Sequence, residues 1–150
     1  MDGSSLFYNK GVRKIKERQA IEILWKTHKY EVMWHDQKSY NRIREMLKAN
    51  CTYDEVENEI QNALSMQPSK GSVVNAYSHV WGYFKKFCRV SEKKLFKKLK
   101  DQYLADQISE TTLLQFIYCM TIYYNIQYLK ESSLIQNFSM TDDTDNDSLH

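Results

Sequence analysis

The chain has 150 residues, of which 42% are hydrophobic and 27% charged, and this suits one domain with a hydrophobic core. Four glycines and one proline are few for a strand-rich fold, whose many turns draw on these residues, so the composition favours long helices. The N-terminus shows no secretory signal, and no apolar run reaches the roughly 20 residues that span a bilayer. We therefore expect a cytoplasmic protein with no membrane partner.

The net charge of +2 is unevenly distributed along the chain. The last stretch has no Lys or Arg and contains four aspartates, Asp142, Asp143, Asp145 and Asp147, so the rest of the chain carries +6. A basic body with an acidic tail indicates either an anionic partner or a solvated surface with a solubilising tail.

The first helical pattern predicts a helix over residues 10–35. Its apolar stripe is formed by residues that share one face: Ile21, Leu24, Trp25, His28, Val32 and His35. His28 and His35 lie on this stripe about 10 Å apart along the helix axis. We therefore interpret them as hydrogen-bonded core histidines rather than ligands of one metal ion.

The same helix has a second face with a different composition. Lys26, Tyr30 and Trp34 follow one another at intervals of four residues, away from the apolar stripe. Aromatic rings between cations suit a nucleic acid, because bases stack on the rings and phosphates pair with the cations. The alternative is that Tyr30 and Trp34 contact another helix.

Two shorter helices follow. The second helix has Tyr40, Ile43 and Leu47 on its inner side. Residues 52–55 match a capping box, in which a Thr hydroxyl and a Glu carboxylate satisfy free backbone N–H groups, and it starts a third helix. The inner side of that helix is formed by Tyr53, Val56, Ile60, Ala63 and Leu64. Residues 67–71 then give the clearest break in the chain.

A fourth helix is expected over residues 72–87. Its core side is formed by Val73, Tyr77, Val80, Trp81, Phe84 and Cys88. The opposite side is formed by Asn75, His79, Gly82 and Lys86, flanked by Ser78, Tyr83 and Lys85. A glycine within a helix costs about 1 kcal/mol relative to alanine. Gly82 therefore predicts either close packing of another helix or close approach of a ligand.

A fifth helix, capped by Ser91, has Leu95, Phe96, Leu99 and Tyr103 on one side. Its surroundings are strongly basic, with only Glu92 opposing eight cations: Lys85, Lys86, Arg89, Lys93, Lys94, Lys97, Lys98 and Lys100. Like charges one helical turn apart repel each other. Phosphate groups would neutralise them, with counterion release adding affinity, and the alternative is a solvated lysine face.

A sixth helix is expected over residues 110–130, capped by Ser109 and apolar almost all round, as is typical of the centre of a bundle. From Gln136 onward the composition predicts disorder. The predicted fold is therefore all-α, a single compact bundle of about six helices with a hydrophobic central C-terminal helix. Residues 1–135 form the domain, and residues 136–150 form an acidic tail.

Motifs for chemistry are sparse. The sequence has no CxxC, HxxxH or HExxH motif and no Gly-rich phosphate loop, and the separated cysteines, Cys51, Cys88 and Cys119, are best explained as buried free thiols. We therefore expect no metal, no cofactor and no catalytic residues that spacing alone could identify.

Two segments resemble signatures of the YbgA-like domain family. The signature HKYxxMxH…Y is similar to residues 28–35, HKYEVMWH, followed by Tyr40. The signature NxxxHxxGYFK is similar to residues 75–85, NAYSHVWGYFK, and the closing YL pair to Tyr128 and Leu129. The likeness covers roughly residues 20–135, although Val73 stands where many members have a His.

The resemblance implies an RNA-binding helical module. In fused members of the family this domain accompanies a cysteine-containing desulfidase domain that acts on thiolated uracil, which implies tRNA with a thiouridine as the RNA. No such desulfidase domain is recognised in this sequence, so we expect a role beside a separate desulfidase or another tRNA-modifying enzyme.

Two alternatives stay open: a protein-interaction module that binds no nucleic acid, and an enzyme with a site centred on His79, with Asn75 and Tyr83 beside it. The candidate RNA-binding residues are Lys26, Lys29, Tyr30, Trp34, Asn75, His79, Gly82, Tyr83, Lys85, Lys86, Lys93, Lys94, Lys97 and Lys98.

Overall fold

The structure is a computed structural model that describes residues 3–139, with side chains described from residue 11 onward. The described part is mostly helical and contains no strand. The helices are α1 (Gly3–His35), α2 (Gln37–Lys48), α3 (Tyr53–Leu64), α4 (Lys70–Trp81), α5 (Val90–Leu104), α6 (Glu110–Tyr124) and α7 (Gln127–Lys130). Residues 133–139 are also helical. The all-α prediction is confirmed, while the acidic residues 142–147 lie outside the described part.

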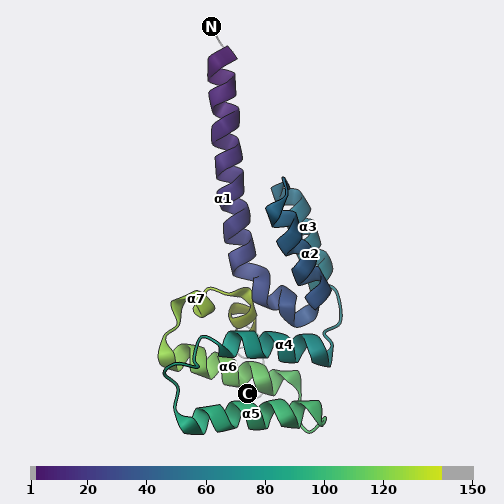
Figure 1. Ribbon diagram of the computed structural model, residues 1–150, viewed down its shortest axis with the longest axis vertical. Coiled ribbons are helices and arrows are strands. Elements are labelled where there is room, and N and C mark those ends of the chain that lie inside the picture. The colour runs from purple at the N-terminus through teal and green to yellow at the C-terminus, as the bar shows by residue number, and fades with distance from the viewer. Residues whose placement is uncertain (1–2, 140–150) are drawn as a thin grey trace, which may run out of the picture.

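The helices form two groups that meet at the end of α1 (Figure 1). In the first group, α2 and α3 pack against each other and against α1. In the second group, α4, α6 and α5 are stacked crosswise to α1, with α6 between the other two. Because α4 contacts both α1 and α6, it joins the two groups.

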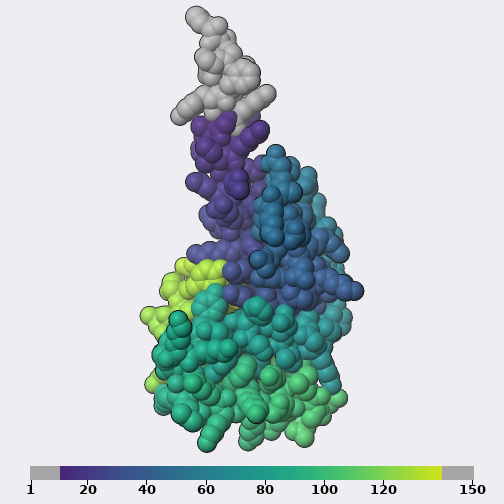
Figure 2. Space-filling model, viewed as in Figure 1, coloured from purple at the N-terminus to yellow at the C-terminus, as the bar shows by residue number. Residues whose placement is uncertain are grey.

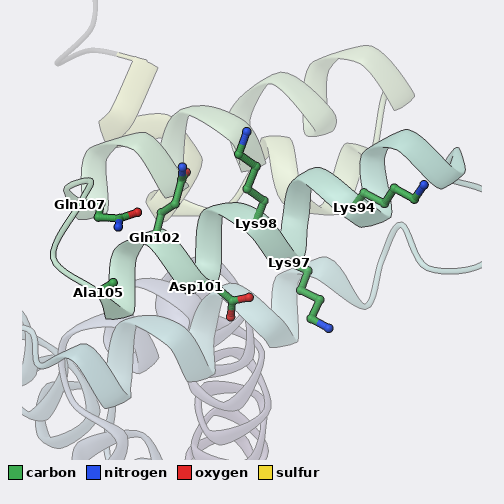
Figure 3. A pocket seen from close by; sticks show the side chains of 7 residues that line it. All are labelled: Lys94, Lys97, Lys98, Asp101, Gln102, Ala105 and Gln107. Carbon is green, nitrogen blue, oxygen red and sulfur yellow. The ribbon is translucent and has the colours of Figure 1, made fainter.

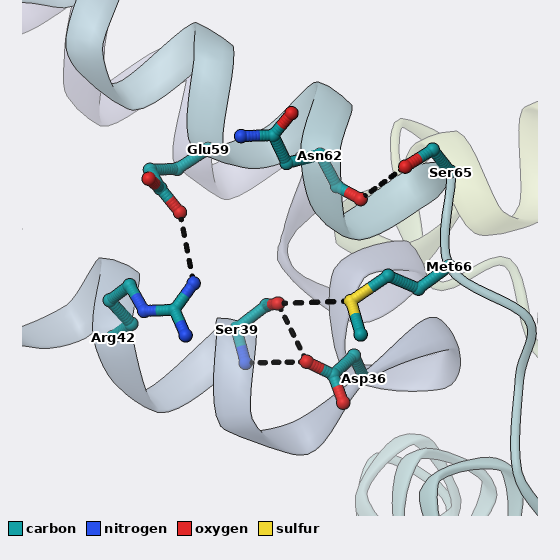
Figure 4. Close-up of polar contacts among 7 residues, drawn as sticks. All are labelled: Asp36, Ser39, Arg42, Glu59, Asn62, Ser65 and Met66. Carbon is teal, nitrogen blue, oxygen red and sulfur yellow. Dashed lines mark hydrogen bonds and ion pairs between the residues drawn. The ribbon is translucent and has the colours of Figure 1, made fainter.

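Short polar contacts fix the starts of α2 and α3 and join the two helices. The Asp36 carboxylate accepts the backbone N–H of Ser39 at 3.0 Å and caps α2, which allows α1 to turn directly into α2. The Thr52 hydroxyl caps α3, as the sequence predicts. Arg42 of α2 reaches across to Glu59 of α3 at 3.2 Å (Figure 4).

The start of α4 is tied to the end of α1. Ser69 and Ser72 form a reciprocal cap on α4. The Ser72 hydroxyl also lies 2.8 Å from the backbone oxygen of Trp34, one of the last carbonyls of α1. Since terminal helix carbonyls have no partner within their own helix, this contact satisfies a group that would otherwise be buried and unpaired.

The core consists of two hydrophobic clusters. One lies between α1, α2 and α3 and is formed by Ile21, Val32, Ile43, Val56, Ile60 and Ala63. The other lies under α4 and includes Met33, Tyr77, Phe84, Leu113 and Ile117. The end of α1 contributes to both clusters because α2 and α3 cover one side of it and α4 covers the other.

The fourth helix is shorter than predicted. It ends at Trp81 rather than Phe87, and residues 82–87 continue as successive turns. The backbone N–H of Gly82 bonds to the oxygen of His79 at 3.1 Å, and a Cβ on Gly82 would lie 3.0 Å from that same oxygen. Gly82 is thus the exposed C-cap of α4 and not a mid-helix residue, and its tight contact is with its own chain. The approach of a ligand to Gly82 stays a prediction.

The C-terminal part differs from the prediction in two ways. First, α6 ends at Tyr124 and not near residue 130, because Asn125 adopts a left-handed conformation with φ of 55° that stops the helix. Second, Ile122 and Tyr123 are exposed, so α6 is not buried all round. The apolar pattern located the helix correctly, but it did not show that one end has an open side.

The folded part extends past residue 135. Residues 136–139 are helical, so the prediction of disorder from Gln136 is wrong for them. Phe138 packs against Tyr118 with 5.4 Å between ring centroids, and the Ser133 hydroxyl donates to Glu31 at 3.1 Å. Residues 140–150 lie outside the described part.

Two further expectations concern the surface. Within residues 3–139, no helix is both long and apolar enough to cross a membrane. All three cysteines are free thiols, but Cys51 and Cys88 are only half-buried and Cys119 is exposed, so the expectation of buried thiols is wrong for Cys119 and met only in part for the other two. Cys119 shares an exposed face of α6 with Gln115 and Ile122.

Candidate nucleic-acid interface

Tyr30 and Trp34 are buried, which corrects the expectation of an open face on the first helix. Their exposed fractions are 8% and 2%, and both side chains belong to the cluster under α4. Spacing had placed them away from the apolar stripe, but α4 covers that side of α1. Neither ring is open to a base, so the alternative interpretation, contact with another helix, is the correct one.

Three tyrosines bring the family-like segments together. Tyr30 and Tyr83 join their hydroxyls at 2.7 Å, and Tyr83 stacks on Tyr128 with 5.7 Å between centroids and 18° between ring planes. Lys26 and Lys29 each place Nζ 5.1 Å from the centre of the Tyr128 ring. We call these five residues the tyrosine junction.

The tyrosine junction contains four of the predicted site residues and one that was missed. Lys26, Lys29, Tyr30 and Tyr83 were candidates, whereas Tyr128 was noted only in the closing YL pair. Burial, followed by the hydrogen bond with Tyr83, raises the pKa of Tyr30 well above its usual range, so its hydroxyl keeps its proton. The hydroxyls of Tyr30 and Tyr83 already bond to each other, which makes the junction primarily a structural contact.

A groove of about 660 Å³ runs beside α1. Its walls include Lys14, Arg18 and Trp25 of α1 and the connection between α2 and α3, and Lys26, Lys29 and Tyr128 of the tyrosine junction also line it. Figure 2 shows α1 standing beside α2 and α3. No sequence pattern indicated this groove, because its shape depends on how the α2–α3 connection approaches α1.

The outer side of α4 carries two further candidates in different environments. The Asn75 side chain is half-buried and donates to the Gln37 side chain at the start of α2. His79, one turn later, is exposed and lines neither the groove nor the hollow on α5 described below. Asn75 thus joins two helices, and the two residues do not form an enclosed site. In the described residues no group of three or more potential ligands could hold a metal ion.

A group of exposed cations lies on α5. Lys93, Lys94, Lys97 and Lys98 are all exposed, and a shallow hollow of about 530 Å³ is bordered by the last three together with Asp101 (Figure 3). In Figure 3 the side chains of Lys97 and Lys98 leave the helix in opposite directions, so the charges spread around it. We call the four lysines the α5 lysine face.

The acidic residue nearest in sequence to these lysines is occupied elsewhere. Glu92 accepts the backbone N–H of Arg89 at 2.8 Å and the hydroxyl of Tyr124. Burial raises the pKa of Glu92, but these two hydrogen bonds and the charge of Arg89 outweigh burial and lower it. Ion pairs between described residues join Arg42 to Glu59, Lys48 to Glu45, Lys70 to Asp106 and Arg89 to Glu92, and none involves the α5 lysine face.

The predicted lysines of the tyrosine junction and those of α5 therefore lie on two separate surfaces. The tyrosine junction lies where α1 meets α7, whereas α5 lies at the far side of the stack, beyond α4 and α6 (Figure 1). Lys85 and Lys86 are exposed on the connection between α4 and α5. The expected single footprint is thus two surfaces, with this connection between them.

Comparison with known proteins gives one match. The model of a family described as "Protein of unknown function (DUF1722)" matches residues 29–139, which include Tyr30, Tyr83, Tyr128 and the α5 lysine face. No curated protein and no solved structure matches the chain. The match covers well over half of the 150 residues, so the chain belongs to this family, whose usual name is YbgA-like.

Proposed function

We propose that this protein binds RNA and that the α5 lysine face is its main phosphate contact. The observation that carries the proposal is a set of four exposed lysines without acidic partners in the described part of the chain. Lys93 and Lys97 are one turn apart, as are Lys94 and Lys98, so each pair repels in the free protein. A polyanion would remove this repulsion and release its own counterions on binding.

The RNA class we propose is tRNA, in a process of tRNA modification such as thiouridine desulfidation, with a separate enzyme as partner. This part of the proposal rests on the family resemblance. The geometry supports a surface-to-surface mode of binding, because the α5 lysine face is open and its charges point in several directions. Such a face suits a folded, double-stranded backbone, whose phosphates lie on a broad convex surface.

The test is fluorescence anisotropy with bulk tRNA, single-stranded DNA and duplex DNA at two salt concentrations. We expect tRNA to bind more tightly than either DNA and binding to weaken as salt rises. The decisive variant changes all four lysines, K93E/K94E/K97E/K98E. Since each lost phosphate contact removes about 0.7–0.9 from the slope of log K against log salt, the slope should fall by about 3.

The matched control reverses four exposed cations on α2, K38E/R42E/R44E/K48E, and changes the net charge by the same amount. We expect this control to keep most of the salt slope. Equal losses in the two variants would mean that total charge matters and not the α5 lysine face. Unchanged tRNA binding in the α5 variant would refute the proposal.

A second candidate, a protein-interaction module, is favoured by a different feature. The groove beside α1 adjoins Ile15, and Ile23 lies two turns further along the helix, with exposed fractions of 61% and 65%. Exposed aliphatic side chains beside a groove are typical of surfaces that bind a partner helix. A partner that co-purifies after nuclease treatment and moderate salt, and is lost in I15E/I23E, would support this function.

A further inference from the structure

A second group of aromatic side chains lies at the C-terminal end of α6, next to the α4–α5 connection. Tyr124 is its central ring. The ring centroid of Tyr124 lies 5.0 Å from that of Phe87 and 4.9 Å from that of Tyr123, and both contacts are edge to face. Phe87 is 50% exposed and Tyr123 is 66% exposed. Two large rings therefore present open surface to solvent within one cluster.

These rings are held in place although they are exposed. The Arg89 guanidinium lies over the Tyr123 ring at 5.1 Å and donates to its hydroxyl at 2.6 Å. The Tyr124 hydroxyl donates to Glu92, which fixes the central ring. A ring that is already ordered loses little conformational freedom when a ligand stacks on it, so this arrangement is prepared for binding.

The charge around the cluster selects an anionic partner. Lys85, Lys86 and Arg89 are exposed in the same connection, and Lys93 follows Arg89 by one helical turn at the edge of the α5 lysine face. Glu92, the acidic residue in this region, is already bonded to Arg89 and Tyr124. A ligand that carries both flat apolar groups and regular negative charge fits this combination, which describes unpaired nucleotides.

We propose that Phe87 and Tyr123 form a stacking platform for unpaired bases of the RNA held by the α5 lysine face. This inference rests on the proposed RNA binding. It adds that the RNA segment contacted beside the α5 lysine face is unpaired. The α5 lysines hold the phosphates of a paired region, and the strand that leaves this region stacks its bases on the two rings. The platform replaces the stacking role that the sequence assigned to the buried Tyr30 and Trp34.

The experiment compares two RNAs with the same paired stem, one blunt and one with a four-nucleotide single-stranded end that contains 2-aminopurine. Stacking on an aromatic ring quenches 2-aminopurine, so its fluorescence reports the contact directly. With the unaltered chain we expect the end to raise affinity about tenfold or more and to be quenched on binding. In F87L/Y123L both effects should disappear, while the affinity for the blunt stem stays the same.

Two controls separate stacking from other effects. Y123F keeps the ring and loses only the hydroxyl, so it should retain the quenching. L104A removes another exposed apolar side chain, at the end of α5, and should change neither quantity. Thermal unfolding of each variant verifies that the fold is kept.

Different results of this experiment would refute the stacking platform and the RNA binding itself. Equal affinity of the unaltered chain for both RNAs, or quenching that persists in F87L/Y123L, would overturn the stacking platform and leave the α5 lysine face intact. Absence of binding to either RNA would overturn both proposals and would favour a protein partner for the exposed rings.

Discussion

The hydroxyl pair of Tyr30 and Tyr83 offers a quantitative test of the tyrosine junction. Tyr30 is 8% exposed, and its hydroxyl finds its partner in Tyr83 at 2.7 Å, whereas Tyr83 is only half-buried. In Tyr83→Phe the Tyr30 hydroxyl stays buried without that partner, which costs about 1–3 kcal/mol. In Tyr30→Phe the remaining hydroxyl can reach water, so the loss should be below about 1 kcal/mol.

The double variant Tyr30→Phe/Tyr83→Phe separates the pair from its two members. With both hydroxyls gone, no polar group is left unsatisfied, so its cost should be close to that of Tyr30→Phe alone. The coupling free energy would then be on the order of 1 kcal/mol. This is well above the deviation from additivity that substitutions at distant, independent sites show. Urea unfolding of the unaltered chain, the two single variants and the double variant measures this coupling free energy. The comparison requires that the m-value is the same in all four.

Additive costs in this cycle would refute the assignment of the hydroxyl pair. RNA affinity gives an independent check, because a residue whose polar atom is used inside the fold should not also be a ligand contact. We expect Tyr83→Phe to leave tRNA affinity unchanged per folded molecule. A loss of affinity without a loss of stability would return Tyr83 to the list of RNA-binding residues.

Three further changes should affect stability in stated directions, each measured by thermal or urea unfolding. Ser72→Ala removes the contact with the Trp34 carbonyl and half of the α4 cap, and should cost about 1–2 kcal/mol, whereas Ser72→Thr should restore part of it. Asn125→Val places a β-branched residue at a φ of 55° and should cost about 1–2 kcal/mol, while Asn125→Gly should be neutral or stabilising. Burial raises the pKa of Glu92 but the hydrogen bonds, chiefly from Tyr124, lower it overall, so its contribution is present above its unfolded pKa of about 4.3 and is lost as pH falls through the lower folded value. Glu92→Gln should therefore be less stable than the unaltered chain at pH 7, and a difference that persists at pH 2 would contradict this account.

Local features of the fold could be predicted from the sequence because they depend on neighbouring residues alone. The Thr52 cap, the inward face of Val56 and Ile60, and the break before α4 follow from capping chemistry and helical periodicity. These signals operate over four or five residues. They were less reliable at two predicted caps, because α5 begins at Val90 with Arg89 as its N-cap in place of Ser91, and the Ser109 side chain makes no capping hydrogen bond on α6.

Features that depend on a second element were missed. The helical pattern of α1 separates an apolar stripe from a second face, but it does not say how many neighbours the helix has. Tyr30 and Trp34 are buried because α4 crosses the end of α1 on the side away from α2 and α3. The end of α4 was missed for a smaller reason, since the turns after Gly82 keep nearly the same side chains inward, as Phe84 shows.

The two kinds of candidate residue differ in how much of their bonding capacity the fold uses. At the tyrosine junction, Tyr30 and Tyr83 bond to each other and Tyr128 stacks on Tyr83. These contacts join α1, the α4–α5 connection and α7, so the three tyrosines serve mainly to hold the fold together. On α5 and beside it the reverse holds, because lysines lack acidic partners in the described chain and Phe87 and Tyr123 leave ring surface open. A ligand gains free energy from groups that the fold has left unused. Tyr30, Tyr83 and Tyr128 therefore serve to join helices, and the RNA binding that we propose is to be tested first on α5 and at the C-terminal end of α6.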